Sequence, residues 1–276
     1  MITNDVDGFE REYIFCMWPG EDKLTPDRAT EVFSILSNSQ RPVIFLTPRS
    51  FKLWELPSAP FHPATQYISE CHMSDYLRVY LMHHFGGGYT DIKFTFKSWV
   101  GAFTALKNNP EALVLGYPFS CPEDFGLSKK FDGSTILADF QNHYFPFGIG
   151  HTAFIFKRKS ILTEDMLNML HEFLDEKLPE LKENPSRAQK DYRNRMLPDG
   201  SASKYPLDYI EMGPDIFHMA LYKHKNHVMH HDIQPATIYH FDLPIEGFAE
   251  KKRQFAEEHP PSWPFIDNQM VNAVVT

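Results

Sequence analysis

The sequence predicts an α/β protein: a single Rossmann-like domain with a mixed, mainly parallel central sheet flanked by helices. Two short apolar runs, 13–18 and 42–48, enclose a stretch with helical start signals. A strand, a helix and a second strand in this order form a βαβ unit, whose two strands run parallel. The chain has 276 residues, enough for a sizeable core, and shows no internal repeat and no second domain boundary.

The βαβ unit occupies the beginning of the predicted domain. The first strand, over 13–18, ends at a Pro-Gly pair at 19–20, which favours a turn. Thr25 is a good N-cap and Pro26 suits the first helical position, so we expect a helix over 26–37. The second strand is followed by a proline-rich connection.

The stretch 73–93 predicts a helix that turns directly into a strand. Ser74 can cap a helix in which apolar side chains recur at the i, i+4 spacing. Three consecutive glycines, 86–88, stop this helix and allow the backbone to reverse. Residues 89–96 alternate and are rich in β-formers, so a strand should follow at once.

Strand and helix patterns continue to alternate after this stretch, with polar turns between them. Such alternation is typical of an α/β fold. The later elements that we expect are a helix over 99–107, a strand over 112–117, a polar loop over 121–132, a strand over 151–157, a helix over 164–177 capped by Thr163, an aperiodic charged segment over 179–206 and a helix that starts at Gly213 and Pro214.

The overall composition excludes some classes of protein. A net charge of −9 and a pI near 5.8 argue against a general nucleic-acid binder. Three scattered cysteines do not suggest a disulfide framework, and no apolar run approaches the roughly 18 residues that a membrane span needs. We therefore expect a soluble, cytoplasmic protein without a membrane span. Its oligomeric state stays open.

Four charged residues within the stretch 73–93 indicate a ligand site. Asp75 and Arg78 lie three positions apart on one helical face, and Asp91 and Lys93 lie two apart on one strand face. If the strand edge meets the helix N-terminus, the four charges converge beside unpaired backbone N–H groups. This arrangement suits a phosphorylated, hydroxyl-rich ligand.

The order Ser-Asp-x-x-Arg followed by Gly-Gly-x-Tyr-x-Asp resembles the segment around the DXD motif in glycosyltransferases of the sugar-binding DXD class. This class includes capsular polysaccharide synthesis enzymes, yeast α-mannosyltransferases and the large clostridial glucosylating toxins. The resemblance implies one GT-A-type domain over 1–276, with nucleotide-sugar binding in 1–118 and the acceptor side in 119–276. It also implies transfer of a hexose or pentose from a nucleoside diphosphate donor, expected to be a UDP-sugar, to a hydroxyl of a glycan or glycoconjugate, with retention of anomeric configuration.

The same resemblance assigns roles to individual residues. Trp18 would stack on the base, Asp75 and Arg78 would bind sugar hydroxyls, and Asp91 would contact ribose and sugar. Near the end of the chain, His259, Ser262 and Trp263 resemble an element that reaches the diphosphate. The full set of expected donor-binding residues is Trp18, Ser74, Asp75, Arg78, Tyr89, Asp91 and Lys93.

Lys93 is the departure from the family pattern, because it stands where the second Asp of DXD would be. Family members use that acid to hold Mn²⁺ or Mg²⁺, which neutralises the diphosphate. An ammonium group repels a metal ion but can pair with phosphate directly. We therefore expect no cofactor besides the donor. The alternatives are a metal held by Asp91 with His259 or Asp267, and a displaced strand that leaves Lys93 in solvent.

No catalytic residue can be assigned from the sequence. An inverting transferase would need a carboxylate near the acceptor hydroxyl, and Asp208, Glu211 and Asp215 are candidates by position alone. Four basic residues could close over a diphosphate or could simply be solvated: Arg187, Lys190, Arg193 and Arg195.

Two other functions remain possible from the sequence. A run of potential ligands could hold a metal, as in a metal-dependent hydrolase or a metal-binding protein, although the spacing fits poorly. That run consists of His224, His227, His230, His231 and Asp232. The loss of one DXD acid also allows a sugar-nucleotide binder without catalytic activity.

Overall fold

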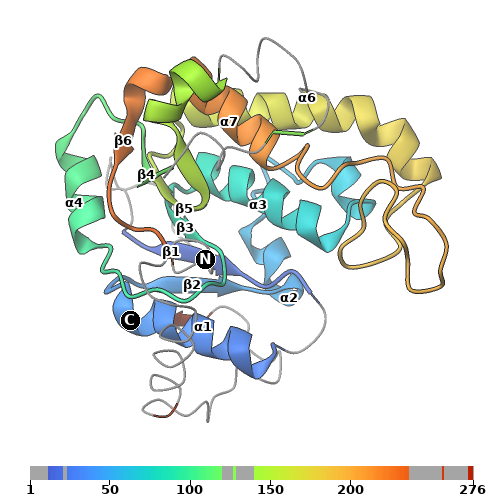
Figure 1. The fold of residues 1–276 in the computed structure, drawn as a ribbon, viewed down its shortest axis with the longest axis horizontal. Helices are drawn as coiled ribbons and strands as arrows, with labels where there is room; N and C mark the ends of the chain where they lie inside the picture. Colours follow the sequence, from blue (N-terminus) through green and yellow to red (C-terminus); the bar gives the residue numbers. More distant parts are fainter. Residues whose placement is uncertain are drawn as a thin grey trace.

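The computed structural model describes residues 12–20, 24–119, 127–128, 140–235, 257 and 273–275. Their strands form one seven-stranded sheet in the order β6-β4-β5-β3-β1-β2-β7 (Figure 1). No helix in these ranges combines the length and the apolar character needed to cross a bilayer. The strands are β1 (Ile14–Met17), β2 (Val43–Leu46), β3 (Gly87–Thr90), β4 (Val114–Pro118), β5 (Ile149–Phe156), β6 (Val228–His230) and β7 (Ala273–Val275).

The pairings confirm the predicted mixed, mainly parallel sheet. β1 is parallel to β2 and to β3, and β4 is parallel to β6. β5 is antiparallel to both of its neighbours, β3 and β4, and β7 is antiparallel to β2. Five of the seven strands therefore share one direction, and only β5 and β7 oppose it.

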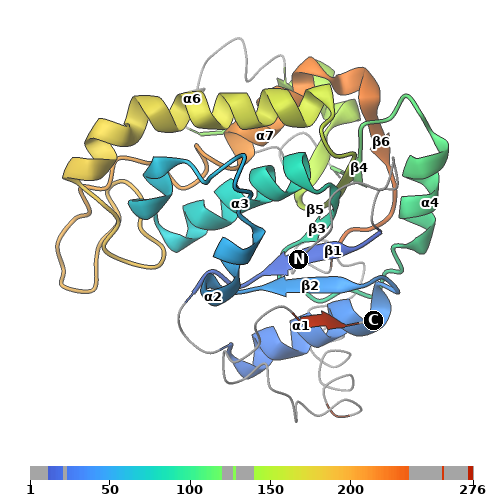
Figure 2. The ribbon, with the colours of Figure 1, turned by 180° about the vertical axis from the view of Figure 1, so that it is seen from behind.

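Helices cover both faces of the sheet and give three layers (Figures 1 and 2). One face packs against α3, α6 and α7, and the other packs against α1 and α4. The α-helices are α1 (Pro26–Asn38), α2 (Pro48–Phe51), α3 (Glu70–His84), α4 (Val100–Asn108), α6 (Ile161–Glu183) and α7 (Pro214–Lys223). Shorter helical turns lie at Lys52–Trp54, Pro63–Gln66, Phe140–Tyr144, Phe145–Phe147 and Lys225–His227.

Strand β1 shows how the sequence produces these layers. Phe15 and Met17 belong to the core beneath α3 and α6, whereas Ile14 and Cys16 belong to the core beneath α1 and α4. Alternate side chains of a strand point to opposite faces, so a strand buried on both faces must be apolar throughout. This explains the short, uniformly apolar run in the sequence.

Most helix boundaries follow the predicted caps, with one correction at α6. Thr25 caps α1 and accepts a hydrogen bond from the Arg28 N–H, and Gly213 precedes α7, both as predicted. Helix α6 begins earlier than predicted, because the Ser160 hydroxyl accepts the Thr163 N–H at 3.2 Å. Ser160 is therefore the cap in place of Thr163. The predicted loop over 121–132 lies outside the described residues except for 127–128.

The predicted cap at Ser74 is wrong. Helix α3 begins at Glu70 after the N-cap Ser69, so Ser74 lies inside the helix. The additional turn buries His72, whose ring nitrogens lie 3.0 Å from the Tyr205 hydroxyl and 3.0 Å from the Asp208 carbonyl oxygen. These partners are more than 130 residues away, and local periodicity cannot reveal such contacts.

The glycines after α3 make the predicted reversal. Gly86 has a φ of 66°, and its N–H donates to the carbonyl oxygens of Leu81 and Met82. A Cβ at Gly86 would lie 2.9 Å from the Arg158 backbone nitrogen, so this position requires glycine. The strand that follows, β3, ends at Thr90 and is much shorter than the predicted 89–96.

Three half-buried histidines of α3 and α6, His83, His84 and His171, make stability sensitive to acid. Burial lowers the pKa of His83 and of His171, and it lowers the pKa of His84 to about 4, with repulsion from His83 adding to the effect. The unfolded chain has ordinary histidine pKa values near 6.5, so it takes up protons first as the pH falls. The contribution of these neutral histidines to the free energy of unfolding is therefore complete above about pH 6.5 and is lost as the pH falls below it.

We expect the melting temperature, measured by calorimetry, to fall between pH 7 and pH 5. His84→Gln should make this fall less steep, because one group that binds protons only after unfolding has been removed. An unchanged slope in the His84→Gln protein would show that His84 titrates equally in both states.

Candidate functional site

A cavity of about 450 Å³ opens at the carboxyl ends of β1 and β3. Its walls come from the residues after β1 and β3, the N-terminal half of α3, the start of β5 and the segment between α6 and α7. Open α/β sheets bind their ligands at this end of the strands. The cavity is lined by every residue expected to bind a donor in the first half of the chain: Trp18, Ser74, Asp75, Arg78, Tyr89, Asp91 and Lys93.

Arg78 lies at the centre of the polar part of this cavity. Its Nη1 donates to Asp75 Oδ1 at 3.0 Å, and its Nη2 donates to Asp91 Oδ1 and to the Tyr89 hydroxyl, both at 3.0 Å. The Tyr89 hydroxyl also donates to Asp91 Oδ1 at 2.7 Å. The structure thus brings Asp75, Arg78 and Asp91 together, and it adds Tyr89 as a bridge between them.

This cluster is largely removed from solvent. Arg78 is 6% exposed and Asp75 is 9% exposed. Burial raises the pKa of Asp75, and the charge of Arg78 opposes that shift. Burial also raises the pKa of Tyr89 well above its ordinary value, so Tyr89 remains a hydroxyl donor. Within the described residues the buried Nε of Arg78 has no hydrogen-bond partner.

Asp75 is held against the start of α7. A Cβ at Gly213 would lie 2.5 Å from Asp75 Oδ1 and 2.6 Å from its Cγ, so only glycine allows this approach. Gly213 is the residue before the first turn of α7. The helix N-terminus that lies beside the Asp75 carboxylate therefore belongs to α7. From the sequence we expected the N-terminus of α3 at this place. The positive end of the helix dipole favours a negative charge there.

Asp91 and Lys93 lie beyond the end of β3, so the prediction that they share a strand face is wrong. Both nevertheless line the cavity. The Asp91 N–H donates to the Thr152 carbonyl oxygen at 2.8 Å, which continues the pairing with β5 for one more residue. In the part of the chain that the structure describes, Lys93 forms no ion pair, although it is only half-exposed.

The cavity is also lined by side chains that sequence reasoning did not select: Arg28, Glu70, His151 and Tyr209. Arg28 donates to the Ile92 carbonyl oxygen at 2.5 Å and pairs with Glu31 at 2.8 Å, which ties α1 to the segment after β3. Glu70 could have been found had the helix been started at Ser69. Tyr209 and His151 carried no local signal, because their roles depend on tertiary contacts.

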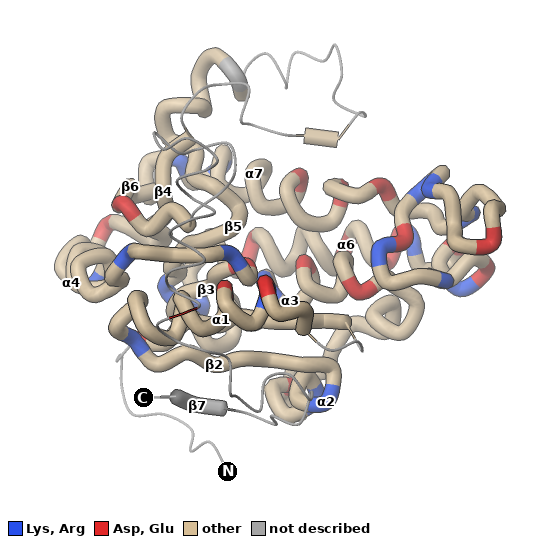
Figure 3. The backbone as a smooth tube through the Cα atoms, turned by 60° about the horizontal axis from the view of Figure 1, so that its bottom comes forward, with Lys and Arg blue, Asp and Glu red and all other residues tan. Residues whose placement is uncertain are grey.

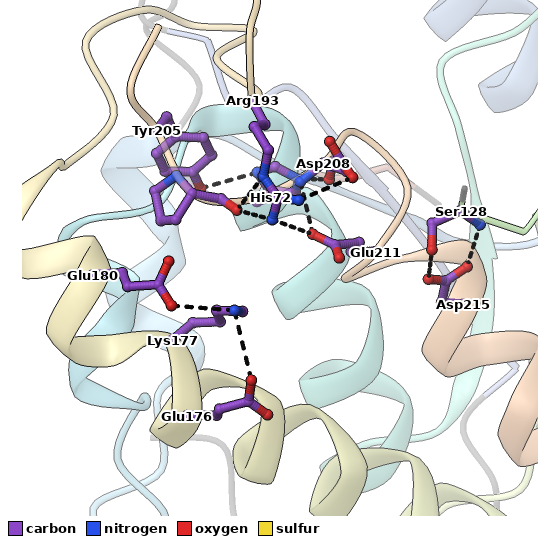
Figure 4. Close-up of polar contacts among 11 residues, drawn as sticks. His72, Ser128, Glu176, Lys177, Glu180, Arg193, Tyr205, Asp208, Glu211 and Asp215 are labelled. Carbon is purple, nitrogen blue, oxygen red and sulfur yellow. Dashed lines mark hydrogen bonds and ion pairs between the residues drawn. The ribbon is translucent and has the colours of Figure 1, made fainter. Parts of the chain in front are cut away.

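The three carboxylates considered as a catalytic base do not line the cavity. Asp215 is buried and accepts two hydrogen bonds from Ser128 (Figure 4). The backbone N–H of Ser128 donates at 2.8 Å and its hydroxyl donates at 2.5 Å. Glu211 accepts the Asp208 N–H at 2.8 Å, and Arg193 contacts both acids at 3.4 Å. These groups fix the segment that leads into α7, which is a structural role.

The basic residues between α6 and α7 do not act together. Acidic and basic positions are intermixed along this segment (Figure 3), and Arg187 pairs with Asp199 at 2.9 Å. Arg193 is committed to the contacts described above. Only Lys190 of the four lines the cavity.

Among the described residues, the side chains of the histidine run are not arranged as metal ligands. His224 bonds to Asp165 at 2.6 Å, His227 to the Glu111 carbonyl oxygen and His230 to the Gly148 carbonyl oxygen. Within the described residues, no three His, Cys, Asp or Glu side chains lie together as metal ligands would. The predicted C-terminal elements His259, Ser262, Trp263 and Asp267 lie outside the described residues.

The chain matches no protein-family model and no curated protein sequence. Its function is therefore inferred from the geometry of the cavity.

Gly213→Ala tests the contact with Asp75. The added methyl group should destabilise the protein by about 1–3 kcal/mol, because it overpacks a buried contact. Urea unfolding measures the change. Gly101→Ala on the exposed side of α4 is the control, because its added Cβ would meet only the imidazole tip of His231, at 3.3 Å, and should change the free energy of unfolding little. The loss should shrink in an Asp75→Ala background. Equal losses in both backgrounds would rule out Asp75 as the group that requires glycine.

Proposed function

We propose that the protein is a glycosyltransferase of the GT-A type that moves a hexose or pentose from a nucleoside diphosphate donor, expected to be UDP-linked, to a hydroxyl group of a glycan or glycoconjugate. One observation carries the proposal. It is the buried guanidinium of Arg78 joined to Asp75 and Asp91 at the carboxyl ends of two parallel strands.

The carboxylates of this cluster suit the sugar of the donor. Ionised carboxylates accept several short hydrogen bonds from hydroxyl groups. Asp75 and Asp91 each give one oxygen, Oδ1, to Arg78, which leaves further acceptor capacity for a ligand. The cluster thus offers several hydrogen-bond acceptors to a polyhydroxyl group.

Lys93 and Lys190 suit a diphosphate. Both line the cavity, and neither forms an ion pair with any described residue. Transfer of the sugar leaves negative charge on the diphosphate, and fixed cations near that charge lower the barrier. Lysine is a point charge that meets phosphate without strict geometry. Two cations that form no ion pair with the described residues are consistent with a ligand that brings two negative charges.

The same residues do not fit a divalent metal. Lys93 puts a positive charge where the second acid of DXD would hold the ion, and Asp91 already accepts from Arg78 and Tyr89. We therefore propose transfer that does not depend on a metal. Trp18, which lines the cavity just beyond β1, supplies a flat aromatic surface for the base.

Retention of anomeric configuration is part of the proposal. The carboxylates considered as a base, at 208, 211 and 215, are absent from the cavity lining in the described residues. Asp75 and Asp91 are both bound to Arg78, which suits orientation of the substrate more than abstraction of a proton. Glu70 is a further carboxylate in the lining.

Nucleotide binding gives the first test. Donors from a panel of nucleotide sugars, and UDP itself, should raise the melting temperature by mass action, and the rise should persist in EDTA. Lys93→Met should weaken UDP binding by about tenfold to a hundredfold, because a charge-assisted contact is lost, and should leave uridine binding unchanged. Lys97→Met, outside the cavity, is the control.

Lys93→Asp extends this test by restoring the second acid of the motif. The variant should bind UDP only when Mn²⁺ is present, and calorimetry with and without EDTA measures this. Loss of wild-type activity in EDTA with recovery in Mn²⁺ would refute metal independence. Binding of none of the nucleotides would refute the donor site itself.

The acceptor side can be tested at Tyr209. Its ring lines the cavity, is 55% exposed and packs edge-on against Tyr192 at 5.6 Å. Tyr209→Ala should raise the KM for the acceptor about tenfold, because a large contact surface is lost, and leave UDP affinity unchanged. Tyr209→Phe should behave as wild type, and Phe147→Ala is a control at an exposed ring elsewhere. A loss of UDP affinity in Tyr209→Ala would move Tyr209 to the donor side.

A further inference from the structure

The segment that carries Asp91 and Lys93 has left the sheet. Residues 91–99 form no helix or strand, yet Lys93 must be held in place if it is to meet a diphosphate. Ile92 and Phe94 are buried, 6% and 0% exposed, and they anchor the segment from one side, while Lys93 between them lines the cavity. Buried side chains resist removal from the core but do not fix the orientation of the peptide groups. That orientation needs hydrogen bonds from another element.

Helix α1 supplies these hydrogen bonds. Near its C-terminal end, Asn38 Nδ2 donates to the Thr95 carbonyl oxygen at 2.8 Å. In the middle of the helix, the buried Ser34 hydroxyl accepts the Thr95 N–H at 3.0 Å. In its first turn, Arg28 Nη1 donates to the Ile92 carbonyl oxygen at 2.5 Å. The polar side chains of α1 therefore take the place of a neighbouring strand.

Arg28 is the one of these three side chains that lines the cavity. Its Nη1 also donates to Glu31 Oε2 at 2.8 Å, and the Glu31 side chain is only 15% exposed. A guanidinium Nη carries two hydrogens, so Nη1 can serve both acceptors at once. The Glu31 carboxylate thus orients the guanidinium, and the guanidinium fixes the carbonyl that precedes Lys93.

We infer that Arg28 is a positioning residue for the proposed donor site: by holding the Ile92 carbonyl it fixes the peptide between Asp91 and Lys93, and with it the place at which the Lys93 ammonium meets the diphosphate. The effect on binding rests on the proposed function. Without the guanidinium, the segment loses the hydrogen bond in its middle, and Lys93 no longer has one fixed direction.

Binding of UDP and of uridine to variants of Arg28 tests the effect. Arg28→Met should weaken UDP binding about fivefold to tenfold, because a hydrogen bond from a charged donor is lost, and should leave uridine binding unchanged. Arg28→Lys can still donate to the Ile92 carbonyl and should bind UDP within about threefold of wild type. Arg49→Met removes the same kind of charge at an exposed position outside the cavity and should bind normally.

The Lys93→Met background separates positioning from direct contact with the ligand. If Arg28 acts through Lys93, Arg28→Met should cost less than about twofold in UDP affinity once the ammonium is gone. Equal losses in both backgrounds would mean that Arg28 binds the phosphate itself, and this would overturn the inference. An equal loss of uridine and UDP affinity in Arg28→Met would also overturn it.

Amide hydrogen exchange tests the inference without a ligand. The hydrogen-bonded amides of Asp91 and Thr95 lie on either side of the Ile92 carbonyl. Both should exchange about fivefold faster in Arg28→Met, because local opening becomes easier, and the amide of Trp18 should not change. Unchanged exchange at both positions would contradict the inference. Failure of UDP to bind wild-type protein would sink the donor site and leave this measurement to decide whether Arg28 fixes the segment.

Discussion

The site depends on the burial of one positive charge, that of Arg78. A guanidinium taken out of water is stable only when its hydrogen bonds and its charge are both matched. Here Asp75 of α3, Tyr89 of β3 and Asp91 just beyond β3 supply the partners, and the close approach of α7 holds Asp75 in place. The positions of these elements and the protonation of the side chains around Arg78 are therefore coupled.

Much of the fold could be predicted from the sequence, because local signals determine it. The apolar run of β1, the Thr25-Pro26 start of α1 and the Gly213-Pro214 start of α7 each act through the backbone of their own neighbourhood. The errors occurred where distant contacts decide. Helix α3 gained a turn because His72 is buried against residues far along the chain. β3 ended early although the alternation of side chains continued.

The candidate site could be predicted in part for the same reason. Asp75, Arg78 and Asp91 belong to one short stretch whose spacing places them together, and the structure joins them. His151 gave no signal, because it reaches the cavity only after β5 has inserted beside β3. For Asp208, Glu211 and Asp215, the sequence suggested a function that the structure does not support. Their position suggested chemistry, but their hydrogen bonds secure the entry into α7.

The turn at Gly86 has a consequence for the order in which the site forms. Arg78 meets Asp75, Tyr89 and Asp91 across separations of 3, 11 and 13 residues, whereas His151 is 73 residues away. Closing a short loop costs little conformational entropy, so the near partners can assemble while most of the chain is still unfolded. We expect the helix–glycine–strand segment to behave as a nucleus whose charge stays hydrated until β5 docks. An early folding intermediate would then hold the arginine and its two acids without yet having a pocket.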